Sequence, residues 1–170
     1  FELEFQINES TRVAAVLLAL PETLKAVQRR GVYRVPVPAD SDLRLRMWRI
    51  PEHACVRDRP LASAELKASL ANISIGGIGA EIVGKGEEPP RITEGERVRL
   101  ELTHADGALI LEARVRHVRI VGDRRRARCG LNFKKLEENL EGRQAQSVLT
   151  RIVGQLQRDE ARRMRLGLAS

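Results

Sequence analysis

Short runs of alternating apolar and polar residues constrain the fold of this chain more than any other feature. Between residues 34 and 133 they recur at short intervals, as in Leu43-Arg-Leu-Arg-Met47 and Val98-Arg-Leu-Glu-Leu102. Alternation with a period of two places one set of side chains on each face of a strand. Turn-forming residues separate these runs, at Pro60, Gly76-Gly77, Pro89-Pro90 and Asp106-Gly107. The pattern predicts a small antiparallel barrel or sandwich, and a closed barrel would leave no exposed edge strand.

Two further features complete the predicted barrel. The run from Leu109 to Val121 changes phase near His117, which predicts a β-bulge there. After Phe133 the period changes to that of a helix. Its apolar stripe consists of Val148, Leu149, Ile152, Val153 and Leu156.

The first twenty residues have a different character. Residues 13–20, VAAVLLAL, are too few to span a bilayer, and the preceding FELEFQINES is acidic rather than a basic leader. We interpret VAAVLLAL as a buried strand. Because the chain begins at Phe, we expect these residues to be the last strands of a longer protein.

Composition favours one core and an anionic partner. The 170 residues are 42% hydrophobic, with a formal net charge of +7 and a pI near 10.2. A basic surface suits a polyanionic or phosphorylated ligand. Nucleic-acid modules also need stacking platforms, whereas aromatic residues make up only 3% of this chain and are scattered. We interpret Tyr33 and Trp48 as core or rim residues.

Cysteines, histidines and glycine-rich segments give no sign of a metal site or an enzyme. Cys55 and Cys129 are far apart, and we expect two buried, reduced thiols. The three histidines lack ligand-like spacing. Gly79 to Lys85 resembles the start of a phosphate-binding loop, but Gly86 replaces the required Ser or Thr. We therefore expect a non-enzymatic protein without metal or cofactor.

Two segments carry the groups of a nucleotide receptor. QRRGVYRV, residues 28–35, contains Arg29, Arg30 and Arg34, whose guanidinium forks match a phosphate or the O6 and N7 edge of guanine. In LANISIGG, residues 70–77, alternation places Asn72 and Ser74 on one face of a strand.

These residues resemble the two signatures of the PilZ domain, the bacterial cyclic di-GMP receptor. Arg30 and Arg34 form R-x-x-x-R, while Asn72, Ser74 and Gly77 form [D/N]-x-S-x-x-G. The segment CGLNF, residues 129–133, is similar to the last barrel strand of the family. The QRR form of the first motif, the strand before it and the Arg-rich final helix resemble the flagellar-brake type.

The resemblance implies a mainly β fold, a six-stranded antiparallel PilZ β-barrel with a C-terminal helix. Residues 1–27 would be the last strands of a truncated N-terminal flagellar-brake-type domain plus a linker. Residues 28–135 would form the barrel, and residues 136–170 the helix and a basic tail.

The resemblance also implies a role for each residue of the site. Arg30 and Arg34 would clamp phosphate and guanine edges, Asn72 would read a guanine, and Ser74 would bond a phosphate or base. Gly77 would let the backbone turn close to the ligand. Arg29 is associated in the family with a paired ligand, so we expect two cyclic di-GMP molecules per chain.

Binding would order residues 26–34 and present a new surface to a protein partner, such as a flagellar motor component. We expect a cytoplasmic protein, a possible homodimer, and no nucleic-acid ligand. Two alternatives stay open: a basic β-barrel that binds nucleic acid, and a PilZ scaffold that binds no ligand.

Overall fold

The computed structural model describes residues 4–8, 13–17, 33–86, 88–122 and 124–167. The chain divides into two units, Phe1–Gly31 and Val32–Ser170. In the first unit, strands β1 (Glu4–Asn8) and β2 (Val13–Leu17) pair antiparallel, with Glu4 opposite Leu17. The strand predicted within residues 13–20 is thus confirmed. That the two strands belong to a preceding domain stays a prediction, as do the domain boundaries at residues 27 and 135.

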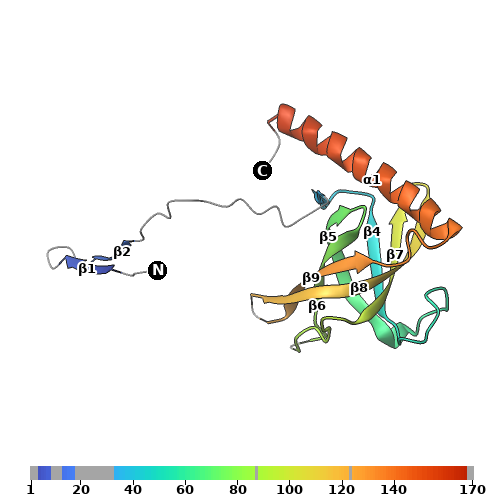
Figure 1. Ribbon diagram of the computed structural model, residues 1–170, viewed down its shortest axis with the longest axis horizontal. Coiled ribbons are helices and arrows are strands. Elements are labelled where there is room, and N and C mark those ends of the chain that lie inside the picture. The colour runs from blue at the N-terminus through green and yellow to red at the C-terminus, as the bar shows by residue number, and fades with distance from the viewer. Residues whose placement is uncertain (1–3, 9–12, 18–32, 87, 123, 168–170) are drawn as a thin grey trace. The chain divides into compact units, whose positions relative to one another are not determined.

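The second unit is a closed antiparallel β-barrel (Figure 1). Its strands lie in the cyclic order β5-β4-β7-β8-β9-β6, and β6 pairs back onto β5. The six barrel strands are β4 (Arg44–Arg49), β5 (Glu65–Ser74), β6 (Gly77–Val83), β7 (Arg97–His104), β8 (Gly107–Val121) and β9 (Arg126–Phe133). A short extra strand, β3 (Val35–Pro36), pairs with β5, and a 3-10 turn covers Ala62–Ala64. The predicted six-stranded antiparallel barrel is confirmed.

The alternating residues fill the barrel interior as predicted. Leu45 and Met47 on β4 face Leu100 and Leu102 on β7, and all four side chains are buried. The predicted bulge is present, because the β8–β9 register shifts between Val115 and His117.

Helix α1 (Leu140–Arg165) lies across one end of the barrel (Figure 1). Its first residue follows Asn139, whose side-chain oxygen accepts a hydrogen bond from the Gly142 amide at 2.7 Å. Leu149, Ile152 and Val153 are buried in the core. The predicted apolar stripe is therefore the face that closes the barrel. Among the described residues, no helix is both long and apolar enough to cross a membrane.

A buried ion pair holds the β4–β5 connection against the barrel. The guanidinium of Arg97 on β7 donates to both carboxylate oxygens of Glu112 on β8, at 2.8 and 2.9 Å. Its remaining nitrogen donates to the carbonyls of Pro51, Glu52 and Ala54. Arg97 and Glu112 are each 8% exposed. One arginine therefore joins two strands and fixes the loop after β4.

Trp48 lies under the same loop, between two arginines. The guanidinium carbons of Arg46 and Arg99 lie 4.6 and 4.9 Å from its ring centroid, and the residue is 3% exposed. Trp48 is thus a buried rim residue, as predicted. Tyr33 is 61% exposed, so it is no part of the core.

The expectation of two buried thiols is wrong for Cys55. Cys55 is exposed, because the loop that contains it lies on the outside of the barrel. Cys129 is buried among the core side chains. Its burial, with the charge of Glu96 as a smaller cause, raises the pKa of the Cys129 thiol to about 11.

Replacing Glu112 with Ala should strongly destabilise the barrel, because Arg97 would remain buried without its counter-charge. We expect a loss of about 3–5 kcal/mol in the free energy of unfolding, measured by urea titration at neutral pH. Glu137→Ala, which removes an exposed carboxylate, is the matched control.

The Arg97–Glu112 ion pair should also make the free energy of unfolding depend on pH. The hydrogen bond from Arg97 lowers the pKa of Glu112 below its ordinary value. The contribution of Glu112 to the free energy of unfolding is therefore complete above the unfolded-state pKa of its carboxyl group. It is lost as the pH falls through the folded-state pKa. The difference between wild type and Glu112→Ala should shrink in acid. Equal stability of the two proteins at neutral pH would contradict this account.

Candidate ligand-binding site

Strand β3 brings the two sequence motifs together. Val35 pairs with Ile73 and Pro36 with Asn72, in antiparallel register. Extending that register by one residue places Arg34 opposite Ser74. Val35 and Ile73 are fully buried, so the alternating residues Arg34, Asn72 and Ser74 belong to the outer face. The structure thereby joins Arg34 to the second motif. Arg29 and Arg30 lie outside the described residues.

Asn72 carries the most unusual polar atom of this face. Its side-chain amide lies over Gly79 on β6, where an added Cβ would come within 2.6 Å of Nδ2. The Oδ1 atom is buried and has no hydrogen-bond partner in the described part of the chain. Leaving a buried acceptor unsatisfied costs about 1–3 kcal/mol. Such an atom is complementary to a ligand that brings an N–H donor.

Ser74 is buried at the end of β5 and stabilises the turn into β6. Its hydroxyl donates to the Gly77 carbonyl at 3.1 Å, and the residue is 3% exposed. Because the hydroxyl donor is occupied, Ser74 offers a ligand only the lone pairs of its oxygen.

Gly77 is required by the neighbouring strand. An added Cβ would lie 2.1 Å from the carbonyl oxygen of Leu131 on β9, a contact that no side chain tolerates. Its φ is not in the left-handed region. The structural reason for this glycine is therefore close strand packing, whereas its predicted contact with a ligand stays a prediction.

Arg34 is half-buried and has no ion-pair or hydrogen-bond partner within the described part of the chain. Other arginines of the barrel, such as Arg46 and Arg97, are paired with carboxylates. An unpaired guanidinium beside an unsatisfied amide oxygen is suited to an anion that also carries N–H donors. No three His, Cys, Asp or Glu side chains of the described segments cluster where they could hold a metal ion.

Three further residues of this face, Gly79, Gly130 and His117, were not predicted from the sequence as site residues. Gly79 pairs with Gly130 on β9, and Gly130 pairs with His117 on β8. The imidazole of His117 lies over Gly130, where an added Cβ would be 2.0 Å from Cε1. Glycine within a strand is the signal that could have indicated this close approach.

A groove of about 680 Å³ adjoins the site on the side of the helix. The loop after β3 forms one wall, and the second half of α1 forms the other. An ion pair of 3.3 Å between Asp40 and Arg163 joins the two walls. Strand β3, which directly follows Arg34, is therefore continuous with a loop that contacts the helix.

Together these features define a small β-barrel domain with polar side chains on part of its outer face. The PilZ domain matches residues 28–154 of the chain. The chain therefore belongs to the PilZ family, as its two motifs indicated.

Solved structures of several bacterial proteins have the same fold. The PilZ domain of YcgR from Escherichia coli with c-di-GMP is 22% identical, with a TM-score of 0.55, and the match covers 84% of this chain and 100% of that one. The inhibitor of motility MotI/DgrA from Bacillus subtilis is 17% identical, with a TM-score of 0.54 and coverages of 92% and 64%. MrkH from K. pneumonia, in complex with c-di-GMP, is 16% identical, with a TM-score of 0.52 and coverages of 94% and 68%. A search of curated protein sequences gives no match.

Replacing Gly77 with Ala should destabilise the barrel, because the new methyl group would collide with the backbone of Leu131. We expect a loss of about 1–3 kcal/mol, the usual cost of overpacking, in urea unfolding. Gly76→Ala is the matched control, since nothing lies within 4 Å of a Cβ added there. Equal destabilisation by the two substitutions would show that the contact with β9 is not the reason for Gly77.

Proposed function

We propose that the chain is a non-enzymatic receptor that binds cyclic di-GMP and regulates motility or surface behaviour. One observation carries the proposal: Arg34 and the Oδ1 atom of Asn72 belong to the same outer face, and neither has a partner among the described residues. Membership of the PilZ family supports it. Two of the similar structures, from E. coli and K. pneumonia, contain c-di-GMP.

The chemistry of guanine fits these groups. Its O6 and N7 atoms accept hydrogen bonds, which suits the guanidinium of Arg34 and, by its place in the motif, that of Arg30. Its N1–H and N2–H groups donate, which suits Asn72 Oδ1. Binding would thus satisfy an acceptor that has no hydrogen-bond partner among the described residues, and would offset the desolvation cost of that atom.

The number of ligands depends on Arg29. A second cyclic di-GMP stacked on the first would add phosphates to a crowded site, and the guanidinium of Arg29 would offset their charge. We therefore propose two cyclic di-GMP molecules per chain, held by Arg29, Arg30, Arg34, Asn72, Ser74 and Gly77.

A route for a conformational response leads from Arg34 to the helix. Arg34 directly precedes β3, and the loop after β3 is joined to α1 by the Asp40–Arg163 pair. Fixing Arg34 on a ligand would change the position of this loop and hence the surface that it forms with the helix. We propose that a cytoplasmic protein partner, such as a flagellar motor component, recognises that surface. One similar structure is an inhibitor of motility.

Two alternatives make different predictions. A nucleic-acid-binding barrel would lose affinity steeply with salt and would tolerate the loss of one arginine. A ligand-free scaffold would bind neither nucleotide nor DNA. The unsatisfied Oδ1 atom of Asn72 favours the receptor. In a scaffold that binds no ligand, this atom would only lower the stability of the fold.

Isothermal titration of cyclic di-GMP into the wild-type chain tests the proposal, with GTP and a short single-stranded DNA as controls. We expect saturable binding near two ligands per chain. Arg34→Ala should weaken binding roughly 5- to 150-fold, the effect of about 1–3 kcal/mol for one bidentate contact. Arg59→Ala removes an exposed arginine of the β4–β5 loop and is the matched control.

Three results would change the account. Binding near one ligand per chain would keep the receptor and contradict the paired ligand. DNA binding without cyclic di-GMP binding would favour the nucleic-acid module. Equal weakening by Arg34→Ala and Arg59→Ala would show that net charge, and not the site, attracts the ligand.

A further inference from the structure

A row of four residues crosses the outer face of the barrel. Asn72 on β5, Gly79 on β6, Gly130 on β9 and His117 on β8 are successive partners in the strand pairing. Their strand neighbours Ile78 and Leu131 are buried in the core, so the row faces outward.

Two planar side chains cover the two glycines of this row. The Asn72 amide lies over Gly79, and three imidazole atoms of His117 lie 2.0–2.8 Å from the position of a Cβ on Gly130. A glycine within a strand is unfavourable and marks a close approach. Here the missing Cβ atoms let an amide and an imidazole lie against the backbone. His117 is nevertheless exposed, so the ring has an outward surface on which a base can stack.

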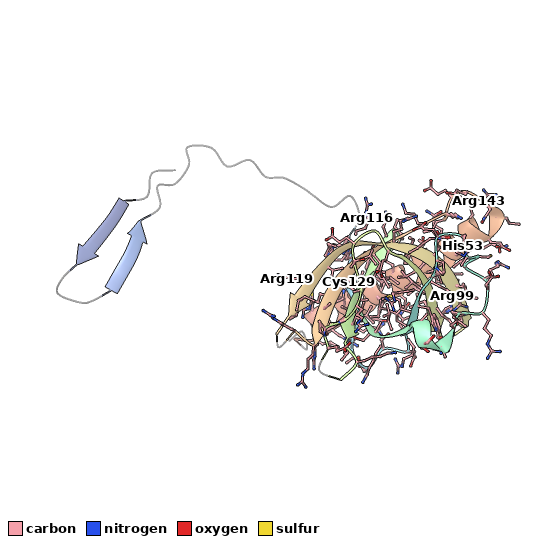
Figure 2. All side chains as sticks on the ribbon, turned by 90° about the horizontal axis from the view of Figure 1, so that it is seen from below. His53, Arg99, Arg116, Arg119, Cys129 and Arg143 are labelled. Atoms are coloured by element: carbon pink, nitrogen blue, oxygen red, sulfur yellow. The ribbon has the colours of Figure 1, made fainter. Side chains whose placement is uncertain are left out.

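Two arginines, Arg119 and Arg128, lie in the next outward-facing row beside the imidazole. Arg119 on β8 and Arg128 on β9 are direct partners in the strand pairing. Both are exposed, and neither forms an ion pair among residues 33–86, 88–122 and 124–167, although Glu81 on β6 is the strand-pairing partner of Arg128. Figure 2 shows Arg119 on the side of the barrel away from Arg99, and thus away from the Trp48 cluster. Like charges directly opposite each other destabilise a sheet. Glu81 on the other side of Arg128 offsets one of the two positive charges, and an anion at Arg119 and Arg128 would offset the other.

The spacing of these groups fits one nucleotide. Arg119 lies two residues after His117, and Arg128 two residues before Gly130. Two residues of a strand span about 7 Å, comparable with the separation of the base and the phosphate in a nucleotide. His117 thus offers a stacking surface for a base. The guanidinium groups of Arg119 and Arg128 in the next row are within reach of the phosphate of that nucleotide.

We propose that His117, Arg119 and Arg128 form a second half of the nucleotide site, on strands β8 and β9. A guanine base stacks on the imidazole of His117, and Arg119 and Arg128 bind the phosphate attached to it. This inference rests on the proposed function, because it takes cyclic di-GMP as the ligand. It extends the site from Asn72 across both glycines to a face that neither sequence motif includes.

Cyclic di-GMP titrations of His117 variants test the stacking. His117→Ala should weaken binding about tenfold or more, the usual effect of removing an aromatic ring under a base. His117→Phe keeps a ring and should bind within about threefold of wild type. His53→Ala removes an exposed histidine elsewhere on the barrel (Figure 2) and should have no effect.

Gly130→Ala provides an independent test through the same ring. The new methyl group would push the imidazole away from β9, so binding should weaken although no ligand-binding group is removed. In the His117→Ala background the methyl group meets no ring, and Gly130→Ala should then cause no further loss. This non-additivity distinguishes a role at the ligand from a general loss of structure.

The arginines have their own matched control. Arg119→Gln and Arg128→Gln should each weaken binding about fivefold and reduce its dependence on salt. Arg143→Gln removes an exposed charge on α1 (Figure 2) and should leave binding unchanged.

The outcomes separate this inference from the proposed function. No binding of cyclic di-GMP by the wild-type chain would overturn both. Wild-type binding that His117→Ala leaves unchanged would overturn the inference alone. Rescue of binding by His117→Lys but not by His117→Phe would show that charge, and not stacking, is the contribution of residue 117, and would also overturn it.

Discussion

Close approach between the backbones of neighbouring strands is the constraint on which this structure depends. Strand β6 closes the barrel by pairing with both β5 and β9, and Gly77 at its start leaves no room for a side chain against Leu131. Two positions further, Gly79 lies under the amide of Asn72. The same feature of β6 thus closes the core and provides the floor of the recognition surface.

The polar groups of the barrel divide into two sets. On β7 and β8, Arg97 and Glu112 satisfy each other and hold a loop in place. Elsewhere on the outer face, Arg34, Arg128 and the Oδ1 atom of Asn72 have no hydrogen-bond or ion-pair partner among the described residues. The first set stabilises the folded state, whereas the second costs stability that a ligand can restore. The face that we propose as the binding site is thus the one that carries the second set.

Local patterns predicted most of the barrel, because alternation and phase depend only on neighbouring residues. The phase change in β8 correctly gave the bulge before His117. The pairing of Arg34 with the second motif required the long-range contact of β3 with β5, which no local pattern encodes. The prediction that Cys55 is buried was wrong. Residue type alone does not show that Arg97 holds the loop containing Cys55 on the outside of the barrel. His117 was predicted only as the position of a bulge. Its place beside the proposed site could not be predicted, because Gly130, which it covers, is distant in sequence.

The most direct test of the account is a map of the bound surface in solution. In ¹⁵N-labelled protein, titration with cyclic di-GMP should shift the side-chain amide signals of Asn72 and the backbone amides of Gly77, Gly79 and Gly130. The backbone amide of Arg99, behind the Trp48 cluster, should not move. Shifts concentrated around Arg99, or saturable binding that leaves the Asn72 amide signals unchanged, would contradict the claim that this outer face is the receptor site.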